Sequence, residues 1–187
     1  MSDLFALKER LKKNYRDFAD DYQRSVEASY KKQLAELKPG ETAPAVKRLV
    51  GDDRKAFEER VKKYRHENER IVKDAENSIA GALSAAPSTE AVNFVSMLNL
   101  RNDLTQSDID AAIAKYGNNY SAYAAIASIG QRQPNKLYTA PHEVDNMRNF
   151  IEMAKPISAS MTLIGAENSA PTRGRAAFID MSLDGEL

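Results

Sequence analysis

Residues 3–38, DLFALKERLKKNYRDFADDYQRSVEASYKKQLAELK, decide the fold of this chain. The stretch contains neither proline nor glycine, and its apolar residues recur from Leu4 to Leu37 at a mean spacing of about 3.67 residues, the period of an 11-residue repeat. Side chains at this spacing lie along one side of a nearly straight helix. We therefore predict one long amphipathic helix, ended by Pro39-Gly40.

A second stretch repeats this pattern further along the chain. Its apolar residues recur from Phe57 to Ile79, again at about 3.67 residues per step. The carboxylates of Asp52 and Asp53 suit a helix N-terminus, so we predict that this helix begins there. Residues 41–51 are then expected to form a connector.

Charge is concentrated in these two predicted helices. Residues 1–78 carry 19 Lys/Arg and 16 Asp/Glu, although the whole chain of 187 residues has a net charge of +0. Such charge suits long, exposed helices, which we expect to form a hairpin or a projecting arm over residues 1–86. Two uses of the apolar stripes stay open: the helices pack on each other, or one stripe faces another subunit.

Three shorter helical patterns follow, between residues 88 and 130. Ser88 opens the first, Thr105 with Asp108 three residues later resembles a capping box for the second, and Asn118 or Asn119 caps the third. Gly117 suits a left-handed residue that closes a helix. The inward face of the first short helix is predicted from its apolar residues, which are Ala91, Val92, Val95, Met97 and Leu98.

The remaining chain divides at Pro156. Pro141 begins another amphipathic pattern, which we expect to stop at Pro156. Residues 87–155 are thus predicted to form a short-helix bundle, and residues 156–187 an extended C-terminal segment. The alternation of Ile179, Met181 and Leu183 with polar residues has a period of two, typical of a strand or of an extended peptide in a groove.

The composition excludes several kinds of chemistry. The chain has no Cys and only two His, His66 and His142, which lie far apart in sequence, so neither a thiolate nor a metal site is expected. No glycine-rich phosphate loop and no nucleophile elbow occurs. We predict no enzyme, no catalytic residues, no cofactor and no small-molecule substrate.

The same numbers limit the setting of the protein. Zero net charge makes nucleic acid an unlikely main partner, although a nucleic-acid role for the basic residues of 1–78 stays open. No run approaches the ~20 apolar residues that a membrane-spanning helix needs. No secretory signal is visible at the N-terminus, so we expect synthesis in the cytoplasm and no membrane partner.

Protein contacts are the function that the sequence favours. A tyrosine has an apolar ring and a polar hydroxyl, which suit a partly exposed contact surface, and apolar side chains near the C-terminus suit docking. The predicted protein-binding residues are Tyr15, Tyr22, Tyr30, Tyr120, Tyr123, Phe178, Ile179, Met181 and Leu183.

Two short phrases carry a family resemblance. Ser88-Thr89-Glu90-Ala91-Val92 and Lys115-Tyr116-Gly117-Asn118-Asn119-Tyr120, behind a charged helical front, resemble small helical proteins encoded near the capsid genes of tailed bacteriophages. The resemblance covers about residues 50–130 and implies a virion or head-assembly role through contacts with its own copies or a larger assembly. The alternative is a soluble helical adaptor or regulatory module that binds a peptide or helix through residues 88–130.

Overall fold

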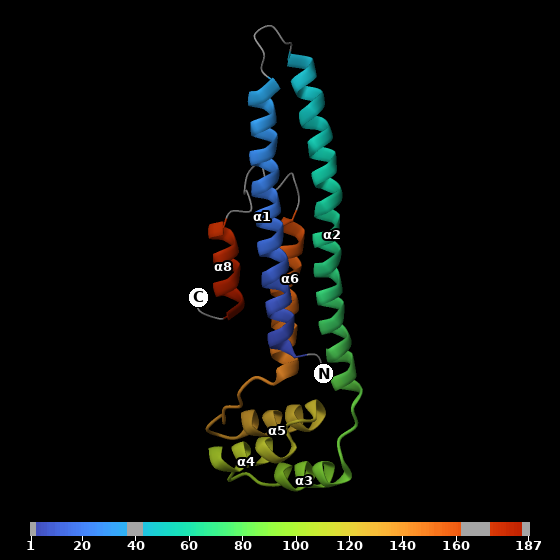
Figure 1. The fold of residues 1–187 in the computed structure, drawn as a ribbon. Helices are drawn as coiled ribbons and strands as arrows, with labels where there is room; N and C mark the ends of the chain where they lie inside the picture. Colours follow the sequence, from blue (N-terminus) through green and yellow to red (C-terminus); the bar gives the residue numbers. More distant parts are fainter. Residues whose placement is uncertain (1–2, 37–42, 162–172, 185–187) are drawn as a thin grey trace. The chain divides into compact units, whose positions relative to one another are not determined.

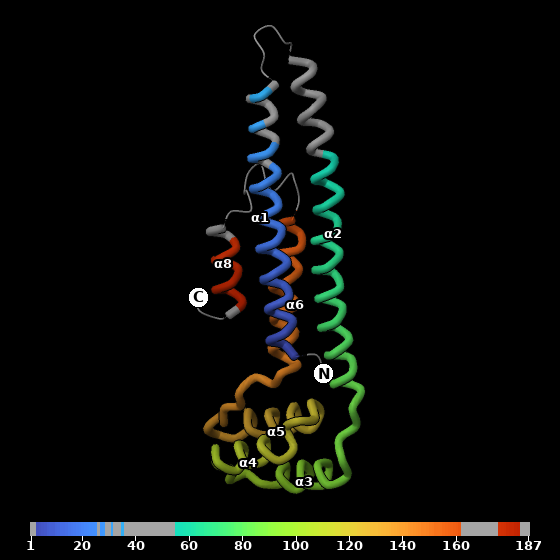
Figure 2. Tube along the Cα trace, viewed as in Figure 1, coloured from blue at the N-terminus to red at the C-terminus, as the bar shows by residue number. Residues whose placement is uncertain are grey.

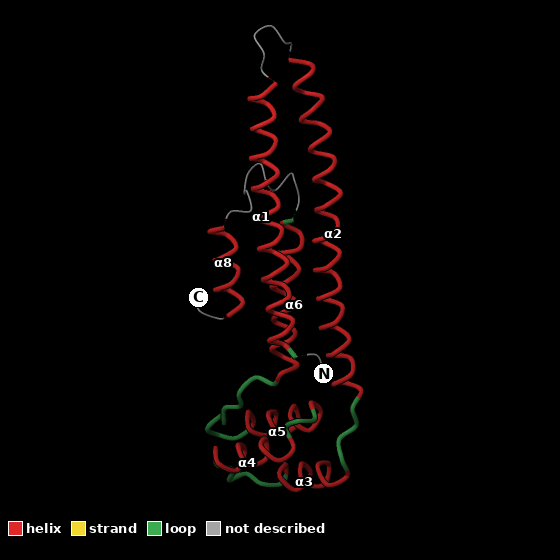
Figure 3. Tube along the Cα trace, in the orientation of Figure 1, coloured by secondary structure: helices red, strands yellow, loops and turns green. Residues whose placement is uncertain are grey.

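The computed structural model describes residues 3–36, 43–161 and 173–184. In these ranges all regular structure is helical and no strand occurs (Figure 3), which confirms the predicted all-α class. None of the helices in the described part combines the length and the apolarity that crossing a membrane requires.

The described residues include seven helices (Figure 1). They are α1 (Leu4–Glu36), α2 (Ala43–Ser84), α3 (Thr89–Asn99), α4 (Gln106–Tyr116), α5 (Tyr120–Arg132), α6 (Glu143–Ser160) and α8 (Arg173–Asp184). The chain forms two compact units: a long-helix unit of Phe5–Asp74 with Phe150–Leu187, and a short-helix unit of Ala75–Asn149 with Met1–Leu4.

In the long-helix unit, α1 and α2 run antiparallel and contact each other. Arg10, near the start of α1, pairs with Glu67 and Asp74 of α2 at 2.8 Å each. Arg60, further back in α2, donates to Asp21 of α1 at 2.9 Å. Residue numbers rise along α1 while those of their partners fall along α2, which fixes the antiparallel direction.

Between the two helices lies an aromatic cluster centred on Phe18. Its ring lies 5.8 Å from Tyr15, 6.4 Å from Phe57 and 5.8 Å from Tyr64, measured between ring centroids. Phe18 and Tyr15 are buried almost completely. Aromatic pairs at these distances add to the free energy that burial alone provides.

A pair of asparagines interrupts this apolar interior. Asn14 donates from Nδ2 to Asn68 Oδ1 at 2.6 Å and to the carbonyl oxygen of Tyr64 at 2.8 Å. Asn68, which is fully buried, donates from Nδ2 to the sulfur of Met161 at 3.3 Å. The pair links α1 and α2 to the residue that follows α6.

Two predicted helix boundaries are wrong. The chain is already helical from Ala43, so residues 43–51 are not a connector. Pro44 lies in the first helical turn, where proline is tolerated. Gly51 lowers the stability of the helix by only about 1 kcal/mol relative to alanine. Helix α6 does not stop at Pro156 but continues to Ser160. Ala154 and Met161, one on each side of this proline, are both fully buried, so packing outweighs the hydrogen bond that proline removes.

In the short-helix unit, α3, α4 and α5 share one apolar core. Its buried members are Leu98, Leu104, Ile109, Ala112, Ile126, Ile129 and Leu137. Helix starts are fixed by side chains: Ser88 accepts from the N–H of Ala91, and Asn119 accepts from the N–H of Ala122, both at 3.1 Å. The predicted capping box of Thr105 and Asp108 is confirmed.

Gly117 is needed for a different reason from the one predicted. Its φ of −68° lies in the right-handed helical region, not in the left-handed one. A Cβ at this position would lie 2.4 Å from the backbone oxygen of Ile113. The close approach of this carbonyl, rather than an unusual backbone angle, favours glycine here.

The C-terminal segment is not extended where the structure describes it. Arg173–Asp184 forms the helix α8, whose middle part is drawn in red in Figure 2. Ala176, Ile179 and Leu183 are buried while Met181 is exposed, a spacing of three and four residues that belongs to a helix. Ile179 and Leu183 fit both a helix and a strand, so the period-two interpretation rested on Met181 alone and is wrong. Residues 162–172 lie outside the described part.

Candidate functional site

Catalytic and metal-binding groups were considered first. Among the described residues, no three His, Cys, Asp or Glu side chains lie close enough to hold a metal ion. His66 is exposed on α2, 3.5 Å from Glu69. His142 directly precedes α6, and its Nδ1 accepts a hydrogen bond from the N–H of Val144 at 3.0 Å. Both histidines thus have ordinary structural surroundings.

The tyrosines predicted on α1 face the interior of the long-helix unit as far as they are described. Tyr15 is buried, and Tyr22 is half-buried with its ring 5.6 Å from that of Phe57. Tyr30 lies in α1, but its side chain is outside the described part. Binding through these three residues stays a prediction.

Tyr120 and Tyr123 hold α5 to the start of α6. The hydroxyl of Tyr123 donates to the carbonyl oxygen of Ala140 at 2.7 Å, and that of Tyr120 donates to Asp145 at 3.1 Å. Both rings pack on His142, with centroids 4.9 and 5.2 Å away. These contacts occupy the rings within the unit, and their use as a binding face stays a prediction.

The four residues predicted near the C-terminus separate onto opposite faces of α8. Ile179 and Leu183 are buried, whereas Phe178 and Met181 are exposed. The helix therefore has an inner face that docks it and an outer face that presents an aromatic ring and a thioether. The sequence prediction grouped these side chains together, and the structure does not.

One side of α3 exposes several apolar residues, contrary to the prediction. Val92 is 48% exposed, Met97 69% and Leu100, which ends the helix, 82%. The prediction that Val92 and Met97 point inward is wrong, because Ala91 and Leu98 are the buried residues of this helix. We call Val92, Met97 and Leu100 the α3 outer face.

Polar and aromatic contacts join α3 to α4 beside the buried face of α3. Glu90, in the first turn, accepts from Lys115 Nζ and from the Tyr116 hydroxyl at 2.8 Å each. The hydrogen bond from Lys115, then that from Tyr116, lowers the pKa of the Glu90 carboxyl. The ring of Phe94 packs on Tyr116 with centroids 4.9 Å apart. Because α3 buries Leu98 in the core that it shares with α5, its outer face points away from that core.

A simple sequence signal could have found this surface. The run Ala91–Leu100, AVNFVSMLNL, contains no charged residue in a chain that is 29% charged. An amphipathic helix normally places charged side chains on its exposed side. In this run the exposed side has only apolar residues and uncharged polar ones such as Asn93 and Ser96. The sequence prediction missed this because it assigned all apolar residues of the run to the inner face.

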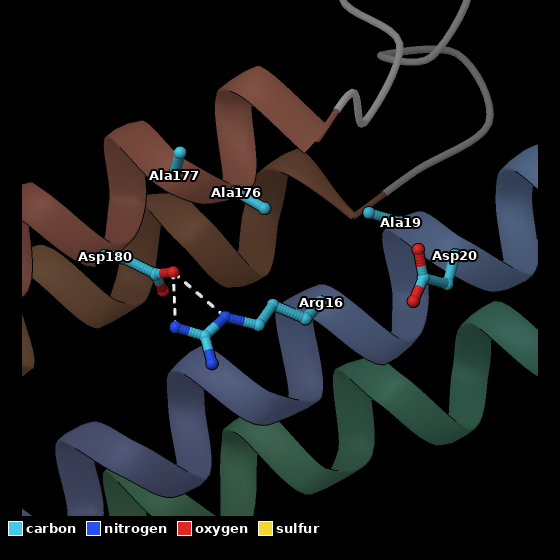
Figure 4. A pocket seen from close by; sticks show the side chains of 6 residues that line it. All are labelled: Arg16, Ala19, Asp20, Ala176, Ala177 and Asp180. Carbon is cyan, nitrogen blue, oxygen red and sulfur yellow. Dashed lines mark hydrogen bonds and ion pairs between the residues drawn. The ribbon is translucent and has the colours of Figure 1, made fainter.

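A second candidate surface is the place where α8 docks, which we call the α8 seat. It consists of Lys8, Arg16 and Ala19 on α1 and Met153, Pro156 and Ile157 on α6. Figure 4 shows Arg16 directed at Asp180, to which its guanidinium donates twice, at 2.9 and 2.5 Å. Lys8 donates to the carbonyl oxygen of Leu183, in the last turn of α8, where a cation is favourable.

Comparison with known proteins adds no relative. No family model matches this sequence, and no curated protein or solved structure matches it.

Proposed function

We propose that this protein is a non-enzymatic structural or assembly component that acts through protein–protein contacts, with the α3 outer face as one contact surface. The observation that carries this proposal is a folded helix with apolar side chains on both sides. Such a helix is normally covered on both sides. The cores of protein interfaces are depleted in charged residues and enriched in methionine, and the α3 outer face has no charged residue and includes Met97.

The narrower proposal is a virion or head-assembly component of a tailed bacteriophage, made in the cytoplasm and incorporated into the particle. Its support is the resemblance of the phrases at residues 88–92 and 115–120. The partners would be further copies of the chain or a larger protein assembly, and the role requires no cofactor.

The second candidate is a soluble helical adaptor or regulatory module. The observation that favours it is the position of the α3 outer face on the short-helix unit, where a partner helix or peptide could pack. An adaptor forms a complex of fixed small stoichiometry, whereas an assembly component forms larger ones, so the mass of the complex distinguishes the two.

The test is light scattering coupled to size-exclusion chromatography, on the chain alone and co-expressed with the products of neighbouring genes. We expect masses above the 20.8 kDa of one chain. The double variant Met97→Lys/Leu100→Lys should reduce the mass, because two lysines would be desolvated in the contact. The matched control is Ala111→Lys/Ala124→Lys, which adds the same charge at exposed positions of α4 and α5. A single chain that acquires no partner in either setting would contradict the proposal.

A further inference from the structure

All of the described polar anchors of α8 come from α1. Arg16 binds Asp180, and Lys8 binds the carbonyl oxygen of Leu183. The Arg16 side chain is 53% exposed and that of Asp180 21%, and ion pairs that are open to solvent contribute little to stability. Three buried side chains, Ala176, Ile179 and Leu183, provide the apolar part of the contact.

Grooves that are open to solvent border α8 along both edges. On the α1 side, a groove of about 260 Å³ is lined by Arg16, Ala19 and Ala176. On the α6 side, a second groove of about 260 Å³ is lined by Met153, Ile157 and Phe178. Water therefore reaches both edges of the contact between α8 and its seat.

One polar atom in the contact is also unsatisfied. Asp180 Oδ2 accepts both hydrogen bonds from Arg16, while Oδ1 is buried and accepts none within the described part of the chain. A buried acceptor without a donor disfavours the docked state. Helix α8 has 12 residues, a length at which an isolated helix is marginal in water, so α8 needs a seat to stay folded.

We propose that α8 is exchangeable: it leaves its own seat and docks in the same seat on a second copy of the chain, so that two copies exchange their C-terminal helices. The proposal deepens the proposed function, on which it rests, by naming a contact between copies. Exchange of an identical element between protomers is a known low-cost route to a dimer.

The chemistry of the α8 seat identifies this occupant. Arg16 requires an acidic side chain, and Lys8 requires the carbonyl end of a helix one turn later. The apolar floor requires small or branched side chains three and seven residues after the first, as in Ala176, Ile179 and Leu183. Helix α8 of a second copy provides this whole set and reproduces every contact, so exchange loses no interaction within the seat.

Reversed charges on two full-length chains test this directly. Arg16→Asp and Asp180→Arg each place like charges together when α8 docks in its own chain. In a mixture of the two variants, exchange pairs opposite charges in both seats. Native mass spectrometry, with one variant labelled with ¹⁵N, should show mixed dimers well above the half expected from random pairing. The double variant Arg16→Asp/Asp180→Arg is the control, because its own pair is restored.

A second measurement uses the absence of cysteine from the sequence. Ala19 and Ala176 line the same groove (Figure 4), one on α1 and the other on α8. Chains with Ala19→Cys and chains with Ala176→Cys, mixed and oxidised, should form a mixed disulfide dimer on a non-reducing gel. The double variant reports how much α8 stays in its own chain.

Two results overturn the proposal. One is the absence of mixed dimers while circular dichroism shows both charge variants folded; the other is the absence of a mixed disulfide in the wild-type seat. Either result would mean that α8 docks only in the seat of its own chain. If the mass still exceeds one chain and falls in the Met97→Lys/Leu100→Lys variant, the assembly function stands and only the exchange of α8 is wrong.

Discussion

The interior of the long-helix unit contains a hydrogen-bonded asparagine pair, whereas the core shared by α3, α4 and α5 consists of apolar side chains. The ends of the helices differ in the opposite sense. Ser88, Thr105 and Asn119 cap the starts of the three short helices, and no side-chain cap of this kind is described for α1 or α2.

This difference teaches how each unit fixes the position of one helix along another. An apolar stripe of regular spacing offers similar burial after a shift of one turn, so a long antiparallel pair needs something that distinguishes one register from the next. Asn14 and Asn68 do so, because the hydrogen bond between their side chains forms only when they lie opposite each other. Short helices have well-defined ends, and their caps and tight turns fix the register.

The largest effect is expected where the long helices bury an aromatic ring. Phe18→Ala should lower the free energy of unfolding by about 3–5 kcal/mol, because Phe18 packs on three rings and is almost fully buried. Phe178→Ala is the matched control and should change it by less than about 0.5 kcal/mol, since Phe178 is 58% exposed. Urea denaturation measures both, and equal losses would contradict the described packing.

The asparagine pair gives the next effect. Asn68→Leu should lower the free energy of unfolding by about 1–3 kcal/mol, because the buried Asn14 Nδ2 loses one of its two acceptors. The double variant Asn14→Leu/Asn68→Leu should recover most of this stability but lose the unique register. Urea denaturation reports the stability, and the number of amide signals in a ¹⁵N–¹H correlation spectrum reports the register. A double variant with one sharp set of signals would show that register is fixed elsewhere.

The fold could be predicted from the sequence wherever the apolar spacing or the capping residues are compatible with a single type of secondary structure. The long stripes specify helices at any register, and the capping residues Ser88, Thr105 and Asn119 mark their helices because a side-chain oxygen next to free N–H groups has few other uses. The prediction of an extended segment was wrong for residues 173–184, because their apolar residues fit both the period of a strand and the period of a helix. The docking of α8 decides between the two.

The candidate surfaces were harder to predict, and the reason is physical. A pattern of apolar residues shows that a helix buries something, but not which of two apolar sides faces the core. For α3, the burial of Leu98 in the core shared with α5 decides this, and α5 begins only at Tyr120, further along the chain. The tyrosine hydroxyls of α5 likewise find partners that only the folded chain brings near.

A pair of glycines gives a third comparison, within the short-helix unit. Gly117→Ala should lower the free energy of unfolding by about 1–3 kcal/mol, because its Cβ would lie 2.4 Å from the backbone oxygen of Ile113. Gly81→Ala should raise it by about 0.5–1 kcal/mol, since a Cβ there has no neighbour within 4 Å and Gly81 lies inside α2. Thermal and urea unfolding measure both. A gain at Gly117 would mean that the carbonyl of Ile113 moves aside freely.

The smallest effect concerns the pH dependence of one cap. The backbone N–H of Thr105 donates to Asp108 at 2.9 Å and its hydroxyl donates at 2.7 Å; the backbone bond, then the hydroxyl bond, lowers the pKa of the Asp108 carboxyl. A carboxyl whose pKa is lowered by folding stabilises the protein above its unfolded value of about 3.9. This contribution is lost as the pH falls through the lower, folded value.

Asp108→Ala should therefore reduce the urea midpoint at pH 7. The difference from the wild type should begin to shrink below about pH 4, where the unfolded carboxyl becomes protonated, and shrink until the pH has fallen through the lower pKa of the native carboxyl. Asp110→Ala, a change of the same kind two residues further along α4, corrects for helix propensity. A difference that stays constant down to pH 3 would mean that the charge on Asp108 does not strengthen the cap. The register of α4 would then depend on its buried residues, as in the long helices, and the contrast between the two units would weaken.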